Sequence, residues 1–212
     1  MKRNRYFVSI ACFVVVLGFL TATHAQETVS SSSLALGAAA PAATVKMKGV
    51  DGRELSIADA KGEKGTLVIF TCNHCPWVKA WETRIAELGN AWQAKGIGVI
   101  AINSNDPAAY PEDAFEEMQK RAKDRGMRYP YVVDATSEVA RAFGASHTPE
   151  IFLFGKDGKL AYKGAVDDNA KEPEKVKEHF LADALEAVAA GKAPAMAETK
   201  ALGCSIKYRK TS

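Results

Sequence analysis

The sequence has little excess charge of either sign, which argues against a nucleic-acid-binding protein. Its formal net charge is +3 at neutral pH, but Lys2, Arg3 and Arg5 supply that excess. The chain after residue 25 carries 25 basic and 25 acidic residues. A nucleic-acid-binding surface needs clustered surplus lysine and arginine, so no nucleic-acid partner is expected.

The N-terminal segment lacks the length of a membrane-spanning helix. Its apolar run extends from Tyr6 to Leu20, whereas a spanning helix needs about 20 apolar residues. The run follows the basic start and leads to Thr23-His24-Ala25, whose small outer residues suit signal peptidase. This order is typical of a secretory signal peptide over residues 1–25. We therefore expect an exported, periplasmic protein; the alternative is an uncleaved segment that anchors the chain to the membrane, facing the periplasm.

Cysteine is scarce, with four in 212 residues. Cys12 lies inside the predicted signal peptide, so Cys72, Cys75 and Cys204 remain in the exported chain. An oxidising compartment permits disulfides. Because the remaining number is odd, one thiol is unpaired or the three exchange partners.

The chain also lacks internal repeats, and its length suits one sizeable core. The small and polar residues 26–41 indicate a tether without stable structure of its own. Residues 42–191 are predicted to form a single domain. Residues 192–212 form a C-terminal extension that carries Cys204.

Within the predicted domain, short apolar runs alternate with amphipathic segments. Residues 66–71 and 96–102 are continuously apolar, as in strands buried on both faces. A helical stripe follows the first of them at Trp77, Trp81, Ile85, Leu88 and Trp92. Further strands are predicted at residues 44–47, 131–133, 151–154 and 160–163, and further helices at 111–123, 137–143 and 176–188. This order predicts an α/β domain with helices packed on a mixed sheet.

The sharpest chemical signal is Cys72-Asn73-His74-Cys75-Pro76, between a buried strand and a helix. The N-terminus of a helix favours thiolate over thiol, and cysteines of this spacing have lowered pKa values. We expect Cys72, farther out on the turn, to attack a disulfide and Cys75 to resolve the mixed species. Pro76 suits a first helical turn. His74 would add positive charge beside the thiolate and make the disulfide more oxidising.

A static structural disulfide and a metal clip are the other interpretations of the pair. A zinc site normally needs a second set of ligands at compact spacing, and His147, His179 and Cys204 are scattered. The sequence therefore favours redox chemistry with no cofactor and no metal. A copper or zinc carrier that uses Cys72, Cys75 and His147 stays open as an alternative.

Thr148-Pro149 stands directly before the predicted strand 151–154. In a domain of this order, the chain returns there beside the cysteine-bearing helix. A cis bond at Pro149 would expose backbone groups near the sulfurs, with which a substrate strand can pair. Ordinary loop punctuation is the alternative. His147 is either a neighbour that tunes Cys72 or an ordinary loop histidine.

Together these motifs resemble the thioredoxin-like superfamily, in particular the redoxin branch that peroxiredoxin-like proteins share with exported thioredoxin-like reductases. The resemblance also includes Gly37-Ala38-Ala39-Ala40-Pro41, Asp51-Gly52, Leu55-Ser56 and Asp59. It implies a thioredoxin-like fold that exchanges disulfides with other exported thiol proteins and with an electron donor or acceptor. It also implies that Cys72 attacks, that Cys75 resolves, and that Thr148 and cis-Pro149 form the substrate platform. His74 occupies a position where strongly oxidising members also carry histidine.

The chain departs from the family pattern around the cysteines. Thr71 replaces the usual tryptophan before the first cysteine. Peroxiredoxins place a threonine three residues before the cysteine that attacks peroxide, whereas Ile69 and Cys72 stand at those positions here. A thiol peroxidase is therefore the alternative function rather than the expected one.

Cys204 follows the alanine-rich, weakly patterned residues 192–202. The ending Gly203 to Tyr208 is similar to that of a poorly characterised peroxiredoxin-like subgroup. Three roles for Cys204 stay open: a third redox thiol that folds back to the pair, an inert buried side chain, or a link between chains.

Overall fold

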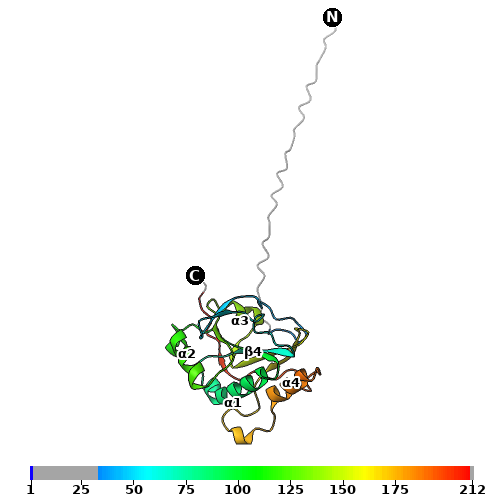
Figure 1. The fold of residues 1–212 in the computed structure, drawn as a ribbon. Coiled ribbons are helices and arrows are strands. Elements are labelled where there is room, and N and C mark those ends of the chain that lie inside the picture. The colour runs from blue at the N-terminus through cyan, green and yellow to red at the C-terminus, as the bar shows by residue number, and fades with distance from the viewer. Residues whose placement is uncertain (2–32, 211–212) are drawn as a thin grey trace. The chain divides into compact units, whose positions relative to one another are not determined.

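The structure is a computed structural model that describes Met1 and residues 33–210 (Figure 1). The predicted signal peptide, apart from Met1, and the predicted tether as far as residue 32 lie outside the described residues. In the part of the chain that the structure describes, no helix combines the length and the apolar character needed to cross a membrane.

The described residues contain a seven-stranded mixed sheet in the order β2-β1-β5-β4-β3-β7-β8. The strands are β1 (Met47–Gly49), β2 (Glu54–Leu55), β3 (Gly65–Phe70), β4 (Ile97–Asn103), β5 (Tyr131–Val133), β7 (Glu150–Gly155) and β8 (Leu160–Gly164). The central strands β3, β4 and β5 are parallel, whereas β7 runs antiparallel to β3 and β8. The predicted mixed sheet is confirmed, although its first strand begins at Met47 rather than at residue 44.

β3 shows why its sequence is continuously apolar. Side chains alternate between the two faces of a sheet. Leu67 and Ile69 pack into one core cluster, and Val68 and Phe70 pack into the other. All four side chains have no exposed surface, so the end of this strand is held firmly at the point where the cysteine pair begins.

Helices cover both faces of the sheet: α1 (Pro76–Gln93), α2 (Phe115–Asp124), α3 (Glu138–Phe143) and α4 (Phe180–Ala189). Buried residues of α1, α2 and α4 share the core cluster of Leu67, whereas those of α3 share the cluster of Val68. Figure 1 accordingly shows α3 across β4 from α1.

Two predicted helices begin later than the sequence indicated. The segment predicted as one helix over 111–123 is a 3-10 turn, η1 (Pro111–Asp113), followed by α2. Ala114 separates them because its backbone is extended, with φ −64° and ψ 155°. The closing helix begins at Phe180, because Val176 is also extended and follows a second 3-10 turn, η2 (Pro173–Lys175).

The prediction of an unstructured tether is wrong for residues 34–41. The backbone N–H of Leu34 donates to Phe143 O at 2.9 Å, and that of Gly37 donates to Leu160 O at 2.9 Å. Ala39 forms a bridge with Lys159. The small side chains of this segment allow its backbone to lie close against the β7–β8 hairpin, which explains a composition that resembles a linker.

The C-terminal extension also folds back onto the domain. Lys163 donates its backbone N–H to Ala197 O at 3.0 Å and accepts that of Thr199 at 3.0 Å. Farther along, β9 (Cys204–Ser205) pairs antiparallel with β6 (His147–Thr148). The extension therefore reaches the loop that carries Thr148 and Pro149.

Gly98 in β4 provides a test of how tightly the sheet is packed. A Cβ at this position would lie 1.8 Å from Ala60 O and 2.5 Å from Gly62 N. Both are backbone atoms, so Gly98→Ala should lower the free energy of unfolding by at least about 1–3 kcal/mol, as overpacking does. Urea unfolding measures the change. Gly155→Ala in β7 is the control, because its nearest neighbour is the Asp157 carboxylate at 2.9 Å, which can rotate away; an equal loss in both variants would contradict the prediction.

Candidate active site

Cys72 and Cys75 lie in the turn that joins β3 to α1. Cys75 is the N-cap of α1, and Pro76 is the first residue of the helix, where the sequence predicted it. Cys72 is 2% exposed and Cys75 is 0% exposed. All the cysteines among the described residues are free thiols. The pair therefore lies just beneath the surface, at the start of the longest helix.

The loop before β7 reaches the same two sulfurs. The Thr148–Pro149 peptide bond is cis, as the resemblance implied. Thr148 Oγ1 lies 3.1 Å from Cys72 Sγ, and the Thr148 carbonyl oxygen lies 3.2 Å from Cys75 Sγ. The structure thus brings the predicted site residues of the two segments together; a role in holding substrate stays a prediction.

Cys204 approaches the pair from the C-terminal extension. Its backbone pairs with Thr148 in the β6–β9 ladder, and its sulfur lies 2.7 Å from Cys75 Sγ. Gly203 makes this approach possible, because a Cβ there would lie 2.3 Å from Thr148 O. The structure thus places Cys204 beside the pair, where a third redox thiol would lie; its redox role stays a prediction.

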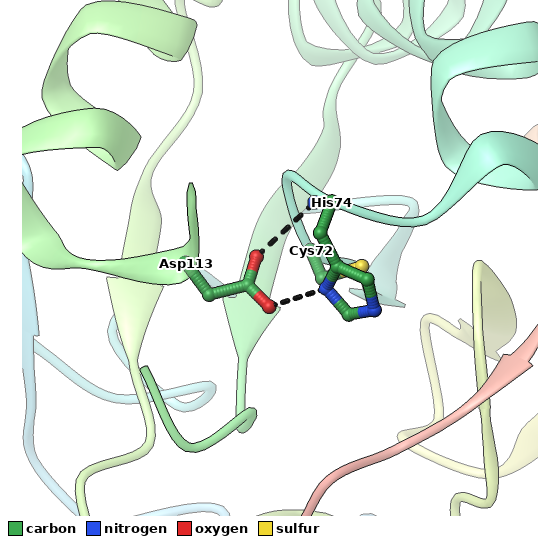
Figure 2. A group of neighbouring side chains, drawn as sticks. All are labelled: Cys72, His74 and Asp113. Atoms are coloured by element: carbon green, nitrogen blue, oxygen red, sulfur yellow. Dashed lines mark hydrogen bonds and ion pairs between the residues drawn. The ribbon is translucent and has the colours of Figure 1, made fainter. Parts of the chain in front are cut away.

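His74 faces a buried carboxylate that the sequence analysis missed. Its Nδ1 lies 2.6 Å from Asp113 Oδ2, and its ring stacks on Tyr110 with centroids 3.7 Å apart. Figure 2 shows the Asp113 carboxylate turned toward the imidazole and the backbone N–H of His74, with Cys72 beside the ring. Asp113 is 1% exposed, so its charge acts on the cysteine pair through little solvent.

Donors from two segments hold Asp113 in place. The backbone N–H of Asn73 donates to Oδ1 at 2.6 Å, and Asn105 Nδ2 donates to Oδ2 at 3.0 Å. Asn73 belongs to the cysteine motif and Asn105 follows β4, so neither marks Asp113 in the sequence. The sequence placed Asp113 in a helix with a solvated face and gave no signal of its burial.

The pKa values of the three thiols follow from these contacts. A hydrogen bond from the Cys72 thiol is the main cause that lowers the pKa of Cys75 to about 4; the Cys204 thiol and backbone N–H groups lower it further, against burial. The bond to Cys75, burial and the Asp113 charge raise the pKa of Cys72 well above its ordinary value. Burial and the neighbouring Cys75 raise the pKa of Cys204 to about 11. These contacts favour a negative charge on Cys75 over one on Cys72 or Cys204.

The attack by Cys72 stays a prediction, although the neighbours of the two sulfurs favour a negative charge on Cys75. Cys75, not Cys72, caps α1, so it receives the favourable field of the helix N-terminus. Cys72 instead feels the Asp113 carboxylate. His74 was predicted to add positive charge beside the thiolate. Its Nδ1 contacts the Asp113 carboxylate, and its effect on the disulfide stays a prediction.

The ligand set proposed for a metal carrier is not assembled among the described residues. His147 Nδ1 lies 2.8 Å from Ser146 Oγ, and His147 is not part of the site's cluster of candidate ligands. That cluster is Cys72, His74 and Asp113, with ligand atoms within 4.8 Å of one another. The imidazole of His74 and the carboxylate of Asp113 contact each other directly. The closeness of the three side chains is therefore explained by a hydrogen-bonded pair beside a thiol, without a metal ion. His179 is exposed at the N-cap of α4.

An open groove of about 580 Å³ adjoins the site. Its lining consists of His74, Pro76, Tyr110, Pro111, Glu112, Cys204, Ser205 and Lys207. Cys204 lines this groove, and it is half-buried where Cys72 and Cys75 are buried. The sulfur that faces the groove is therefore the one from the C-terminal extension.

A model of the AhpC/TSA family matches residues 36–163 of the chain. The chain belongs to this family. Among curated AhpC/TSA-like relatives, the thiol-disulfide oxidoreductase ResA of Geobacillus thermodenitrificans is 25% identical over 180 residues, which cover 84% of this chain and 96% of the relative. The redoxin branch that the motifs resembled is thus confirmed.

Solved structures agree with this family. An uncharacterized conserved protein from Geobacillus kaustophilus is 35% identical with a TM-score of 0.77, covering 84% of this chain and 94% of that one. The thioredoxin domain of a thiol-disulfide oxidoreductase from Bacteroides vulgatus is 26% identical with a TM-score of 0.51, covering 63% of this chain and 90% of that one. The predicted thioredoxin-like fold is confirmed.

The charge on Cys75 can be tested by titration. The far-ultraviolet thiolate absorbance of the reduced protein should persist at neutral pH and disappear as the pH falls through about 4, where Cys75 takes up a proton. Cys72→Ala should move this midpoint upward, because it removes the main hydrogen-bond donor. Cys75→Ser should lack the transition. A wild-type midpoint near the ordinary thiol value of about 8.5 would contradict the assignment.

Proposed function

We propose that this AhpC/TSA-family protein is an exported thiol–disulfide oxidoreductase that exchanges disulfides with other exported proteins through Cys72 and Cys75. The observation that carries the proposal is the placement of both sulfurs at the N-terminus of α1 and against one residue, Thr148, with Cys72 Sγ 3.1 Å from its Oγ1 and Cys75 Sγ 3.2 Å from its carbonyl oxygen. Thiolate is the species that attacks a disulfide, and an adjacent thiol resolves the mixed disulfide. The curated relatives named thiol-disulfide oxidoreductase support the same chemistry.

The exchange transfers two electrons. In the dithiol state Cys75 carries the charge; formation of the Cys72–Cys75 disulfide passes two electrons to a partner disulfide, which leaves as two thiols. In the opposite direction a partner dithiol is oxidised and the pair is reduced. Thr148 and Pro149 form the platform beside the sulfurs, with its edge at Thr148 paired to β9 of the same chain. The partners include an electron donor or acceptor of the same compartment.

The low pKa of Cys75 indicates which direction is favoured. A stabilised thiolate stabilises the reduced form, which makes the disulfide a stronger oxidant. The contacts of Cys75 lower the pKa of its thiol, as in activated cysteines. We therefore assign the pair to the oxidising end of the thioredoxin-like proteins.

Equilibration with glutathione tests this function. The wild-type protein should pass from dithiol to disulfide in a two-electron transition, at a potential less negative than the roughly −270 mV of thioredoxin. Mass spectrometry after acid quenching and alkylation measures the fraction oxidised. A transition at or below the thioredoxin potential would refute the oxidising assignment.

Cys75→Ser is the matched control, because it removes the central sulfur and should leave no intramolecular disulfide at any glutathione ratio. Hydrogen peroxide distinguishes the thiol-peroxidase alternative. Cys75 is 0% exposed, and Cys72 stands where peroxiredoxins carry threonine. Peroxide should therefore oxidise the reduced protein no faster than a free thiol, as followed by stopped-flow tryptophan fluorescence.

Export rests on the basic start, the apolar run and Thr23-His24-Ala25. The protein recovered from the periplasmic fraction should begin at Gln26, as read by N-terminal sequencing. Recovery of the full-length chain in the membrane fraction would instead favour an uncleaved anchor that faces the periplasm.

A further inference from the structure

We propose that Cys204 is a third redox thiol, which relays disulfide exchange between the groove and the buried Cys72–Cys75 pair. The inference rests on the proposed function and adds the route by which partner sulfur reaches the pair. Its basis is the juxtaposition of Cys204 Sγ and Cys75 Sγ, 2.7 Å apart, at the floor of a groove that Cys204 lines.

Accessibility is the first argument. A partner sulfur must approach along the axis of the disulfide that it attacks, which requires an open path to one of the two sulfurs. Cys72 and Cys75 are 2% and 0% exposed. Cys204 is half-buried and lines the groove. In the structure as it stands, a partner therefore meets Cys204 before it meets either member of the pair.

The position of Cys204 is also fixed on both sides, so the contact is not that of a loose tail. Before it, Gly203 lies directly against the Thr148 backbone. After it, the backbone N–H of Ile206 donates to Ser146 O at 2.9 Å, and that of Lys207 donates to Asn105 Oδ1 at 2.7 Å. Ile206 is 7% exposed and packs in the core.

Cys75 lies between two sulfurs, which allows an internal exchange without net redox change. Starting from the Cys72–Cys75 disulfide, the Cys204 thiolate attacks Cys75 Sγ. The Cys75–Cys204 bond forms, the Cys72–Cys75 bond breaks, and Cys72 takes up the proton that Cys204 released. The oxidising equivalent has then moved to a disulfide with one sulfur at the groove.

The partner reaction follows from this disulfide. A partner thiolate attacks Cys204 Sγ from the groove, and Cys75 leaves as the thiolate. The second thiol of the partner is then deprotonated and attacks the partner sulfur that is bonded to Cys204. Cys204 leaves as a thiol. The partner loses two electrons and gains a disulfide; one of its two protons passes to Cys204 and the other to solvent. Cys72, Cys75 and Cys204 all end reduced, and the same steps reversed reduce a partner disulfide. Cys75 is a good leaving group because its neighbours hold its pKa low.

The decisive experiment compares wild type with Cys204→Ser, with a short two-cysteine peptide as the reducing partner. Peptide mapping of partly oxidised wild type should find a Cys75–Cys204 disulfide beside the Cys72–Cys75 disulfide. Cys204→Ser should still form the Cys72–Cys75 disulfide, but its reaction with the peptide should slow by about tenfold or more. Cys72→Ser should form the Cys75–Cys204 disulfide.

Gly203→Ala tests the same idea with all three cysteines present. Its Cβ would meet Thr148 O at 2.3 Å, which forces β9 away from β6, so it should reproduce the slow reaction of Cys204→Ser. Lys200→Ala is the control: it alters an exposed residue of the same extension that does not line the groove and should react at the wild-type rate. Circular dichroism checks that each variant is folded.

The outcomes separate the two proposals. Wild-type rates in both Cys204→Ser and Gly203→Ala, with no Cys75–Cys204 disulfide in the peptide map, would overturn the relay and leave the oxidoreductase standing. A wild-type chain that forms no disulfide on Cys75 at any glutathione ratio would overturn the proposed function, and the relay with it.

Discussion

The register between β3 and β7 is the constraint on which the site depends. In this antiparallel pair Phe70 lies opposite Glu150. Cys72 follows Phe70 by two residues and Thr148 precedes Glu150 by two, so the two segments leave the sheet at the same point. The second ladder extends the same logic, because Thr148 lies opposite Cys204. Two backbone registers thus bring together sulfurs that are far apart in the sequence, and a slip of one residue in either would separate them.

Burial of the cysteine pair restricts where the cluster can carry a negative charge. An unpaired charge away from water is costly, so a buried thiolate needs donors close by. Cys75 lies at the N-cap of α1 with the Cys204 sulfur 2.7 Å away, whereas Cys72 has the Asp113 carboxylate nearby. Formation of a disulfide on Cys75 removes both the charge and the need for those donors. Oxidation of the site therefore also removes its negative charge. Asp113 does not exchange disulfides, but its charge disfavours a thiolate on Cys72.

The sequence predicted the parts of the structure that side-chain patterns specify. The apolar run of β3, the tryptophan stripe of α1 and the position of Pro76 each have a local cause, and each was predicted correctly. The segments at both ends of the described chain were not, because residues 34–41 and 192–202 are held through backbone hydrogen bonds, which leave no side-chain pattern. Asp113 was missed for a related reason: its partners come from the cysteine turn and from the end of β4, and only the folded chain brings them together.

The C-terminal extension occupies the backbone edge that the sequence predicted as the substrate platform. A backbone edge beside the sulfurs allows a partner to pair as an added strand, and the sequence predicted Thr148 and Pro149 for that purpose. In the structure the edge at Thr148 is occupied by β9 of the same chain. Cys204 Sγ then lies 2.7 Å from Cys75 Sγ, beside this paired edge. The extension therefore holds its own sulfur against the cysteine pair, and the ladder that fixes it is only two residues long on each side. So short a ladder is held by few hydrogen bonds. The position of Cys204 therefore also depends on the contacts of Gly203, Ile206 and Lys207, which flank it on both sides.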